Sequence, residues 1–418
     1  MDHFHLKDGA LWCEDVPLER IAEAVGTPVY VYSTATLERH AAVFRKGLAP
    51  VGDVHFAFAV KANPNLAVLR VLAKAGYGAD IVSGGELARA LAAGMAPADI
   101  VFSGVGKTRA ELVAALDAGI GQFNIELEEE GRVLAALAAE RGQVAQAVLR
   151  VNPDVDAGTH AKISTGKAEN KFGVGVDQAP AIFARLAGLP GLNLRGVAIH
   201  IGSQLQTLEP LEAAYARIGA LVDELRGAGH AITHVDLGGG LGVPYRAGDS
   251  YPSPAALGEM MARVTRDWNV TFMVEPGRVI AGNAGVLLTR VIWVKPGVLY
   301  PHVIVDAAMN DLARPALYDA WHDFAAVRPT GVNETVNIAG PVCESGDTFA
   351  TARRIDRVAS GDLAVFRTAG AYGATMASTY NSRALVPEVL VSGDRFAVVA
   401  DRIDPATILA AERVPEWL

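Results

Sequence analysis

Four polar segments, each at the end of a short apolar run, carry the side chains best suited to chemistry. Lys61 follows the run 54–60, His200 ends the run 194–200, and a glycine triplet occupies 238–240, while 275–278 reads EPGR. A lysine amine at the end of a buried strand can form an imine with a carbonyl compound, because burial disfavours its charged form. Glycine-rich loops can bind phosphate through backbone N–H groups. We therefore consider an imine-forming lysine and a phosphate site.

Each of these residues also has a purely structural interpretation. Lys61 could extend its ammonium group to solvent at the rim of a fold. His200 could be a hydrogen-bonded core histidine, the triplet 238–240 a tight turn, and Glu275 a helix cap. A structural or interaction role explains each residue singly, but it does not explain why all four follow successive apolar runs.

The apolar runs predict the elements that position these residues. Each run is short, is followed by turn residues and then by an Ala- and Leu-rich helical pattern, as in 65–75, 85–93, 109–118 and 211–228. Continuous apolar runs are typical of parallel strands buried on both faces. The eight runs are 54–60, 78–82, 100–102, 122–125, 147–151, 194–200, 234–237 and 272–275. Eight strand–helix repeats favour a (β/α)8 TIM-like barrel over an open sheet, and such barrels place active sites at the C-terminal strand ends.

The pattern changes after about residue 285. Strand-like runs separated by Gly, Pro and Asp then predict an antiparallel β domain, and they lie at 286–294, 302–305, 335–338, 363–367 and 395–400. The segment 27–32 is also strand-like and is expected to pair with this later domain. We predict an α/β protein with the barrel at 35–282 and a β-sandwich or β-barrel-like domain formed by 1–34 and 283–418.

Composition excludes several classes of protein. The chain has 418 residues with 37 Lys and Arg against 46 Asp and Glu, a net charge of −9, which argues against nucleic-acid binding. The two cysteines, Cys13 and Cys343, predict neither a disulfide framework nor a metal site. The first residues lack a signal-peptide pattern, and no apolar stretch is long enough to span a membrane. The expected location is the cytoplasm.

Two motifs resemble nucleotide sites but are incomplete. The segment 103–108 (SGVGKT) would need glycine at 101 to form a phosphate-binding P-loop, and that residue is Val101. The segment 238–242 would need glycine at 243 to form a dinucleotide fingerprint, and that residue is Val243. A kinase, an ATPase and a Rossmann dehydrogenase are therefore disfavoured.

Ten short segments, in order along nearly the whole chain, resemble the fold-type III decarboxylases that use pyridoxal 5'-phosphate (PLP). Within that fold type the sequence is most similar to the diaminopimelate decarboxylase family, which catalyses the last step of bacterial lysine synthesis. The segments are 27–32 (TPVYVY), 58–64 (FAVKANP), 80–86 (DIVSGGE), 170–173 (NKFG), 200–203 (HIGS), 238–240 (GGG), 275–278 (EPGR), 314–318 (RPALY), 340–347 (GPVCESGD) and 369–373 (AGAYG). Segment 160–166 departs from the family pattern, in which it contributes a loop near the active site.

The resemblance implies a role for each barrel residue. Lys61 would carry PLP as the internal aldimine, His200 would stack on its ring, and Glu275 would pair with the pyridine nitrogen. A carboxylate there keeps the nitrogen protonated, which deepens the electron sink. The further cofactor-binding residues implied are Asp80, Ser203, Gly239, Gly240, Gly277, Arg278 and, from a second subunit, Tyr372.

The resemblance also implies the substrate and the assembly. Arg278 and Arg314 present planar forks suited to carboxylates. In the family they bind the distal end of meso-diaminopimelate together with Tyr318, Glu344 and Tyr372. Cys343, supplied across a homodimer interface, is the candidate proton donor. The implied reaction converts meso-diaminopimelate to L-lysine and CO2.

Other functions remain open from the sequence. A decarboxylase of the same family could act on another amino acid, such as D-ornithine, D-lysine or a carboxylated polyamine precursor. A racemase of this fold would lack the Cys343–Glu344 motif. A small PLP-binding homeostasis protein would consist of the barrel alone, which the β-rich segment after 285 disfavours.

Overall fold

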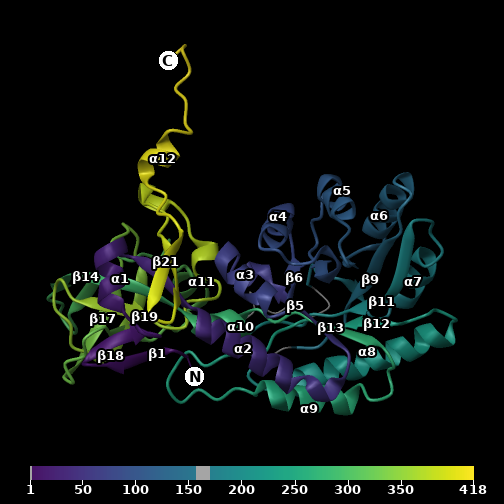
Figure 1. The fold of residues 1–418 in the computed structure, drawn as a ribbon, viewed down its shortest axis with the longest axis horizontal. Helices are drawn as coiled ribbons and strands as arrows, with labels where there is room; N and C mark the ends of the chain where they lie inside the picture. Colours follow the sequence, from purple (N-terminus) through teal and green to yellow (C-terminus); the bar gives the residue numbers. More distant parts are fainter. Residues whose placement is uncertain (1, 157–169) are drawn as a thin grey trace. The chain divides into compact units, whose positions relative to one another are not determined.

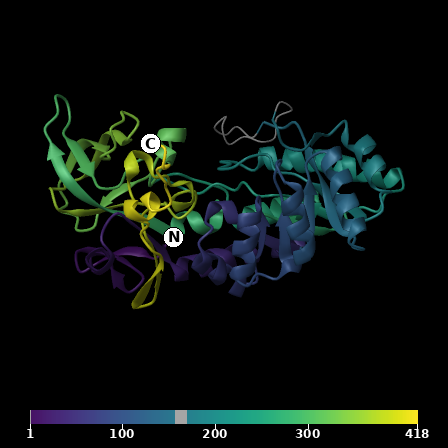
Figure 2. The ribbon, with the colours of Figure 1, turned by 90° about the horizontal axis from the view of Figure 1, so that it is seen from above.

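The computed structural model describes residues 2–156 and 170–418, so the segment 160–166 lies outside the described residues. The chain forms two compact units, drawn in Figure 1 and from above in Figure 2. One unit comprises residues 38–243 and 250–280, and the other comprises 1–37, 244–249 and 281–418. Each unit has its own sheet and is described separately.

The first unit is a closed barrel of eight parallel strands. In spatial order they are β5 (Val54–Ala59), β6 (Gly78–Ile81), β7 (Ile100–Phe102), β8 (Gln122–Ile125), β9 (Ala145–Asn152), β11 (Leu192–Ala198), β12 (His234–Asp236) and β13 (Thr271–Val274). The β8–β9 pairing and the β13–β5 pairing complete the ring. A short strand, β10 (Val174–Gly175), pairs with β9 outside it. The predicted TIM-like barrel is confirmed.

Helices connect the successive strands and surround them (Figure 1). They are α2 (Thr34–Gly47), which precedes the first strand, then α3 (Leu66–Lys74), α4 (Gly84–Ala92), α5 (Arg109–Ala118), α6 (Glu128–Glu140), α7 (Ala179–Leu186), α8 (Glu209–Gly227), α9 (Pro254–Val264) and α10 (Arg278–Ala281). Several begin at side-chain caps that satisfy orphan backbone N–H groups. Ser83 caps α4, and Thr108 forms a capping box with Glu111 on α5.

The second unit is built on a nine-stranded sheet that also uses the N-terminal strand β4 (Val29–Ser33). The strands after the barrel are β14 (Gly285–Lys295), β15 (His302–Val305), β16 (Phe324–Ala326), β17 (Asn333–Ala339), β18 (Thr348–Asp356), β19 (Leu363–Phe366), β20 (Glu388–Ser392) and β21 (Arg395–Ala400). As predicted, β4 pairs within this later sheet, between β14 and β20.

The prediction of an antiparallel domain is wrong for two of these pairings. β20 runs parallel to β4, and β15 runs parallel to β17, so the sheet is mixed. Both pairs join strands that are not connected by a hairpin, and the local turn signals that predicted antiparallel neighbours therefore do not apply to them.

An apolar core holds this second unit together. The first helix, α1 (Leu18–Val25), buries Leu18 and Ile21 against the inward side chains of β4 and β14. A small antiparallel sheet of β1 (Phe4–Lys7), β2 (Ala10–Cys13) and β3 (Val16–Pro17) joins the same cluster. The short helices α11 (Arg314–Tyr318) and α12 (Pro405–Leu409) complete the unit. Across the described part of the chain, no helix is both long and apolar enough to cross a membrane.

Candidate active site

Lys61 lies at the C-terminal end of β5, in the short 3-10 turn Val60–Ala62. Its ammonium group forms an ion pair with Asp80 on the neighbouring strand β6, and the register that pairs Ala59 with Asp80 explains their proximity. The Lys61 side chain is 36% exposed, whereas Asp80 is fully buried.

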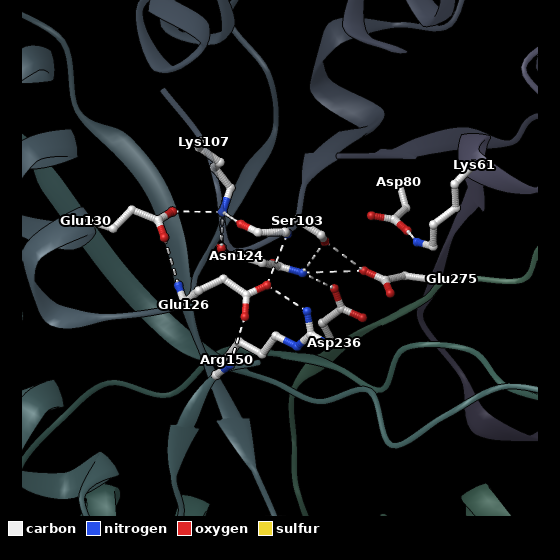
Figure 3. Close-up of polar contacts among 12 residues, drawn as sticks. Lys61, Asp80, Ser103, Lys107, Asn124, Glu126, Glu130, Arg150, Asp236 and Glu275 are labelled. Carbon is white, nitrogen blue, oxygen red and sulfur yellow. Dashed lines mark hydrogen bonds and ion pairs between the residues drawn. The ribbon is translucent and has the colours of Figure 1, made fainter. Parts of the chain in front are cut away.

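Glu275 follows β13 and lies within a buried polar group that Figure 3 displays. Its carboxyl Oε1 accepts hydrogen bonds from Ser103 Oγ at 3.3 Å and Asn124 Nδ2 at 3.4 Å. The carboxyl of Asp236, at the end of β12, lies close enough for its charge to raise the pKa of Glu275. Two buried carboxyl groups this close together cannot both ionise, so they hold a proton between them.

The proton of this pair resides chiefly on Glu275. Burial raises the pKa of Glu275 well above its usual range, and the nearby charges of Asp236 and Asp80 raise it further. Asp236 receives compensating hydrogen bonds from Asn124 Nδ2 at 3.0 Å and from the Gly238 backbone N–H at 2.9 Å. Asp236 is thus the better stabilised carboxylate, and Glu275 is the carboxyl group that can donate a proton in a hydrogen bond.

His200 follows β11 and is neutral. The Gly239 backbone N–H donates to His200 Nδ1 at 3.2 Å, so the ring proton is on Nε2. Burial, together with the nearby positive charges of Arg150 and Lys61, lowers the pKa of His200 to about 3. The ring therefore stays uncharged throughout the neutral pH range.

A glycine-rich cradle adjoins His200. A Cβ atom at Gly239 would lie 2.3 Å from the Glu275 carbonyl oxygen, and one at Gly240 would lie 2.6 Å from that of Gly202, so neither position accepts a side chain. Arg278 is only 6% exposed, and its Nη2 donates to Ser203 Oγ at 3.1 Å. Gly277 lies immediately before Arg278 in the same turn. A buried guanidinium, a hydroxyl and closely approaching backbone form a suitable anion site.

The remaining predicted site residues belong to the second unit. Arg314 and Tyr318 lie at the two ends of α11. Cys343 and Glu344 are exposed on the loop between β17 and β18. Tyr372 follows β19 and has a positive φ of 55°. The barrel end therefore gathers Lys61 with its predicted neighbours, whereas these five residues lie in a different unit.

Two side chains shape the loop that carries Cys343 and Glu344. Asp347 accepts hydrogen bonds from the backbone N–H groups of Met309 and Val342, both at 2.7 Å. The Cys343 backbone N–H donates to Asn381 Oδ1 at 3.1 Å. These bonds hold the loop in a tight turn that leaves the Cys343 thiol exposed.

The P-loop-like segment 103–108 has a structural role instead of binding a nucleotide. The Lys107 side chain is fully buried and donates to Glu130 Oε1 at 2.7 Å and to the carbonyl oxygens of Gly104 and Asn124, each at 2.8 Å (Figure 3). Its three donors are thus all used within the chain. This agrees with the interpretation of the motif as incomplete.

Comparison with known proteins identifies the family. Residues 34–282 match the model described as pyridoxal-dependent decarboxylase, pyridoxal binding domain. Diaminopimelate decarboxylases of Zymomonas mobilis and Pseudomonas aeruginosa are 51% and 50% identical to this chain, each over 99% of both chains. The chain belongs to the diaminopimelate decarboxylase family. The crystal structure of the M. jannaschii diaminopimelate decarboxylase with L-lysine has a TM-score of 0.94 at 36% identity, covering 100% of this chain and 99% of that one.

The cofactor of the diaminopimelate decarboxylase family is PLP, and the barrel end fits it. An amine able to form an imine is present in Lys61, and Glu275 holds a proton suited to a pyridine nitrogen. The glycine cradle with Arg278 and Ser203 suits a phosphate. When bound, PLP supplies the electron sink that accepts the electron pair left by the departing CO2.

Sequence reasoning missed several residues around this family's barrel site. Ser103 and Asn124 hydrogen-bond to Glu275, and Asn124 also binds Asp236, yet none of the three lies in the ten segments that resemble the family. Arg150, near His200, pairs with Glu126 at 2.6 Å (Figure 3). The available signal was a polar residue inside or at the end of an apolar strand, because such a residue is buried and needs a partner.

Proposed function

We propose that this protein catalyses the PLP-dependent decarboxylation of meso-diaminopimelate to L-lysine and CO2. The observation that carries the proposal is the similarity over 99% of the chain to diaminopimelate decarboxylases that are about half identical. A match of this extent includes both units, and so it includes the barrel end together with Arg314, Tyr318, Cys343 and Glu344.

In this proposal the barrel residues bind the cofactor and control its protons. Lys61 binds PLP covalently, and Asp80 orients the lysine through their ion pair. Glu275 would hydrogen-bond the pyridine nitrogen through the proton that it holds, while Asp236 remains the ionised carboxyl group of the pair. The neutral His200 ring packs on the cofactor without adding charge. Ser203, Gly239, Gly240, Gly277 and Arg278 hold the phosphate.

The residues of the second unit would bind the far end of the substrate. The fork-shaped guanidinium groups of Arg314 and, from the barrel unit, of Arg278 bind the distal carboxylate, and Tyr318 donates to it. Glu344 meets the distal ammonium group, and Tyr372 contacts the cofactor and the substrate. The exposed Cys343 thiol donates the proton that replaces CO2 at the reacting carbon.

A panel of amino acids tests the proposed substrate. Purified protein should release CO2 from meso-diaminopimelate with a kcat/KM about a hundredfold above that for ornithine, arginine or lysine, since these amino acids lack a second carboxylate for Arg314. Initial rates of CO2 release measure this ratio. Equal rates with ornithine or arginine would leave only the general decarboxylase assignment.

We further infer that the active sites are shared between two subunits of a homodimer. The inference is supported by the distribution of the residues, because Lys61 belongs to the barrel unit while Cys343, Glu344 and Tyr372 belong to the other. In a dimer with shared sites, each site would combine the barrel of one subunit with the loop of its partner.

Mixing two inactive variants tests the shared sites. A Lys61→Ala chain and a Glu344→Ala chain, mixed in equal amounts and allowed to exchange, should recover about a quarter of wild-type activity, because about half of the dimers are hybrids with one intact site of two. Mass spectrometry of the native dimers confirms the exchange. Hybrid dimers without activity would show that each site is built within one chain.

A further inference from the structure

Arg314 is held by a histidine that no recognised motif includes. The Arg314 side chain is 7% exposed, and its Nη1 donates a hydrogen bond to His322 Nε2 at 2.8 Å. The guanidinium carbon lies 4.6 Å from the centre of the Tyr245 ring, a distance typical of a cation–π contact. Tyr245 also packs edge-on against His322, with ring centres 5.2 Å apart. Three side chains thus form one buried cluster in the second unit.

The hydrogen bonds of His322 define its charge. Its Nδ1 lies 2.9 Å from the Arg367 carbonyl oxygen, which can only accept, so Nδ1 carries the ring proton. Nε2 is then the unprotonated nitrogen and accepts from Arg314. If both ring nitrogens were protonated, the Nε2–H of His322 would point at the Nη1–H of Arg314, and two donors would face each other. His322 is therefore a neutral imidazole with a single tautomer.

Hydrogen bonds and a ring contact anchor the backbone on both sides of His322. Arg353 Nη1 donates to the His322 carbonyl oxygen at 2.9 Å, and the Arg367 backbone N–H donates to the Asp323 carbonyl oxygen at 2.8 Å. The preceding Trp321 ring contacts the guanidinium group of Arg353, whose central carbon lies 3.2 Å from the ring centre. His322 is 2% exposed. A side chain fixed in this way can set the position of the group that it binds.

The neutral charge of His322 affects how well Arg314 can bind an anion. A carboxylate in the place of His322 would also orient Arg314, but it would neutralise the charge that a substrate carboxylate needs. A neutral imidazole fixes one N–H of the fork without placing a negative charge beside it. The Tyr245 ring face restricts the plane of the same guanidinium.

We propose that His322 is a positioning residue that orients Arg314 to bind the distal carboxylate of the substrate. The proposal rests on the proposed function, in which Arg314 is the carboxylate-binding residue. It adds that carboxylate specificity depends on a side chain that does not itself touch the substrate.

Two ligands that differ by one carboxylate give a direct test. L-lysine retains the distal carboxylate of meso-diaminopimelate, whereas cadaverine has the same chain without it. For the holoenzyme His322→Phe variant, which keeps an aromatic ring but loses the acceptor, KM for meso-diaminopimelate and the inhibition constant of L-lysine should both rise about tenfold. The inhibition constant of cadaverine and kcat should change by less than about twofold.

Further variants separate this role from general stability. His322→Gln retains an acceptor and should restore part of the lysine affinity, whereas His5→Phe, at an exposed site on β1, should behave as wild type. Thermal melting and the cofactor absorbance report the integrity of each protein. If His322→Phe fails to fold, the His322→Gln variant tests the positioning role by itself. It should bind lysine more weakly than the wild type does, while its affinity for cadaverine stays unchanged.

The outcomes distinguish the inference from the proposed function. A variant of His322 that weakens lysine and cadaverine equally, or that changes neither, overturns the positioning role. In an Arg314→Ala background, His322→Phe should have no further effect on lysine affinity, and an additive effect would also overturn it. If Arg314→Ala itself leaves lysine affinity unchanged, the carboxylate-binding role in the proposed function fails instead.

Discussion

Replacing Lys61 with alanine should lower the rate of CO2 release from meso-diaminopimelate by about a thousandfold or more. The variant loses the only atom at the end of β5 that can bind the cofactor covalently, and the loss of a group that acts covalently has effects of this size. Removal of Lys61 also leaves the fully buried Asp80 without its ion-pair partner. Initial rates of CO2 release measure the loss of activity, and the cofactor absorbance of the purified protein measures the loss of covalent cofactor binding.

Chemical labelling shows whether Lys61 is the lysine involved. Borohydride reduction of the wild-type protein should attach the cofactor to one peptide, the one that contains Lys61, and the label should be absent from Lys61→Ala. Lys74→Ala provides a matched control, because Lys74 is exposed at the end of α3. A label on any other lysine would contradict the assignment.

Replacing Arg314 with alanine should lower kcat/KM for meso-diaminopimelate by about a hundredfold. The substrate carboxylate then lacks its cationic fork and is left poorly paired in a buried site, a loss worth about 2–3 kcal/mol. The borohydride label at Lys61 should be unchanged, because Arg314 belongs to the other unit and not to the barrel end. Steady-state kinetics and the labelling experiment test the two halves of this prediction.

The control for Arg314 is an exposed arginine of the same unit. Arg395→Ala, on β21, should keep wild-type kinetics because its side chain is exposed at a sheet edge. If Arg314→Ala decarboxylates meso-diaminopimelate as efficiently as the wild type does, the distal carboxylate is bound elsewhere.

The barrel could be predicted from local sequence patterns. Each of the eight strands is a short apolar run between turn residues, and every predicted run overlaps an observed strand, for example 54–60 with β5 (Val54–Ala59). A strand buried on both faces needs an apolar residue at nearly every position, so a continuous apolar run in the sequence directly indicates such a strand. The placement of Lys61, His200 and Glu275 at one barrel end follows, because parallel strands bring their C-terminal ends together.

The parallel pairings β4–β20 and β15–β17 could not be predicted in this way. In each pair the two strands are far apart in the chain, and their direction depends on packing within the whole sheet. The proton on Glu275 is a similar case, because the sequence does not reveal that Asp236, 39 residues earlier in the chain, lies against it. A pKa depends on burial and on charges nearby in space.

Lys107 and His322 show, for single side chains, the same difference between what the sequence predicts and what only the folded structure decides. The segment around Lys107 resembles a phosphate-binding loop but lacks the glycine at position 101, and the burial of Lys107 against Glu130 shows a structural ion pair. No pattern marked His322, since its role depends on contacts with Arg314 and with the Arg367 carbonyl oxygen 45 residues away. Local runs predict which elements form, because propensity and burial act over a few residues. The partner, charge and tautomer of a buried polar side chain depend on groups that only folding brings within hydrogen-bonding distance.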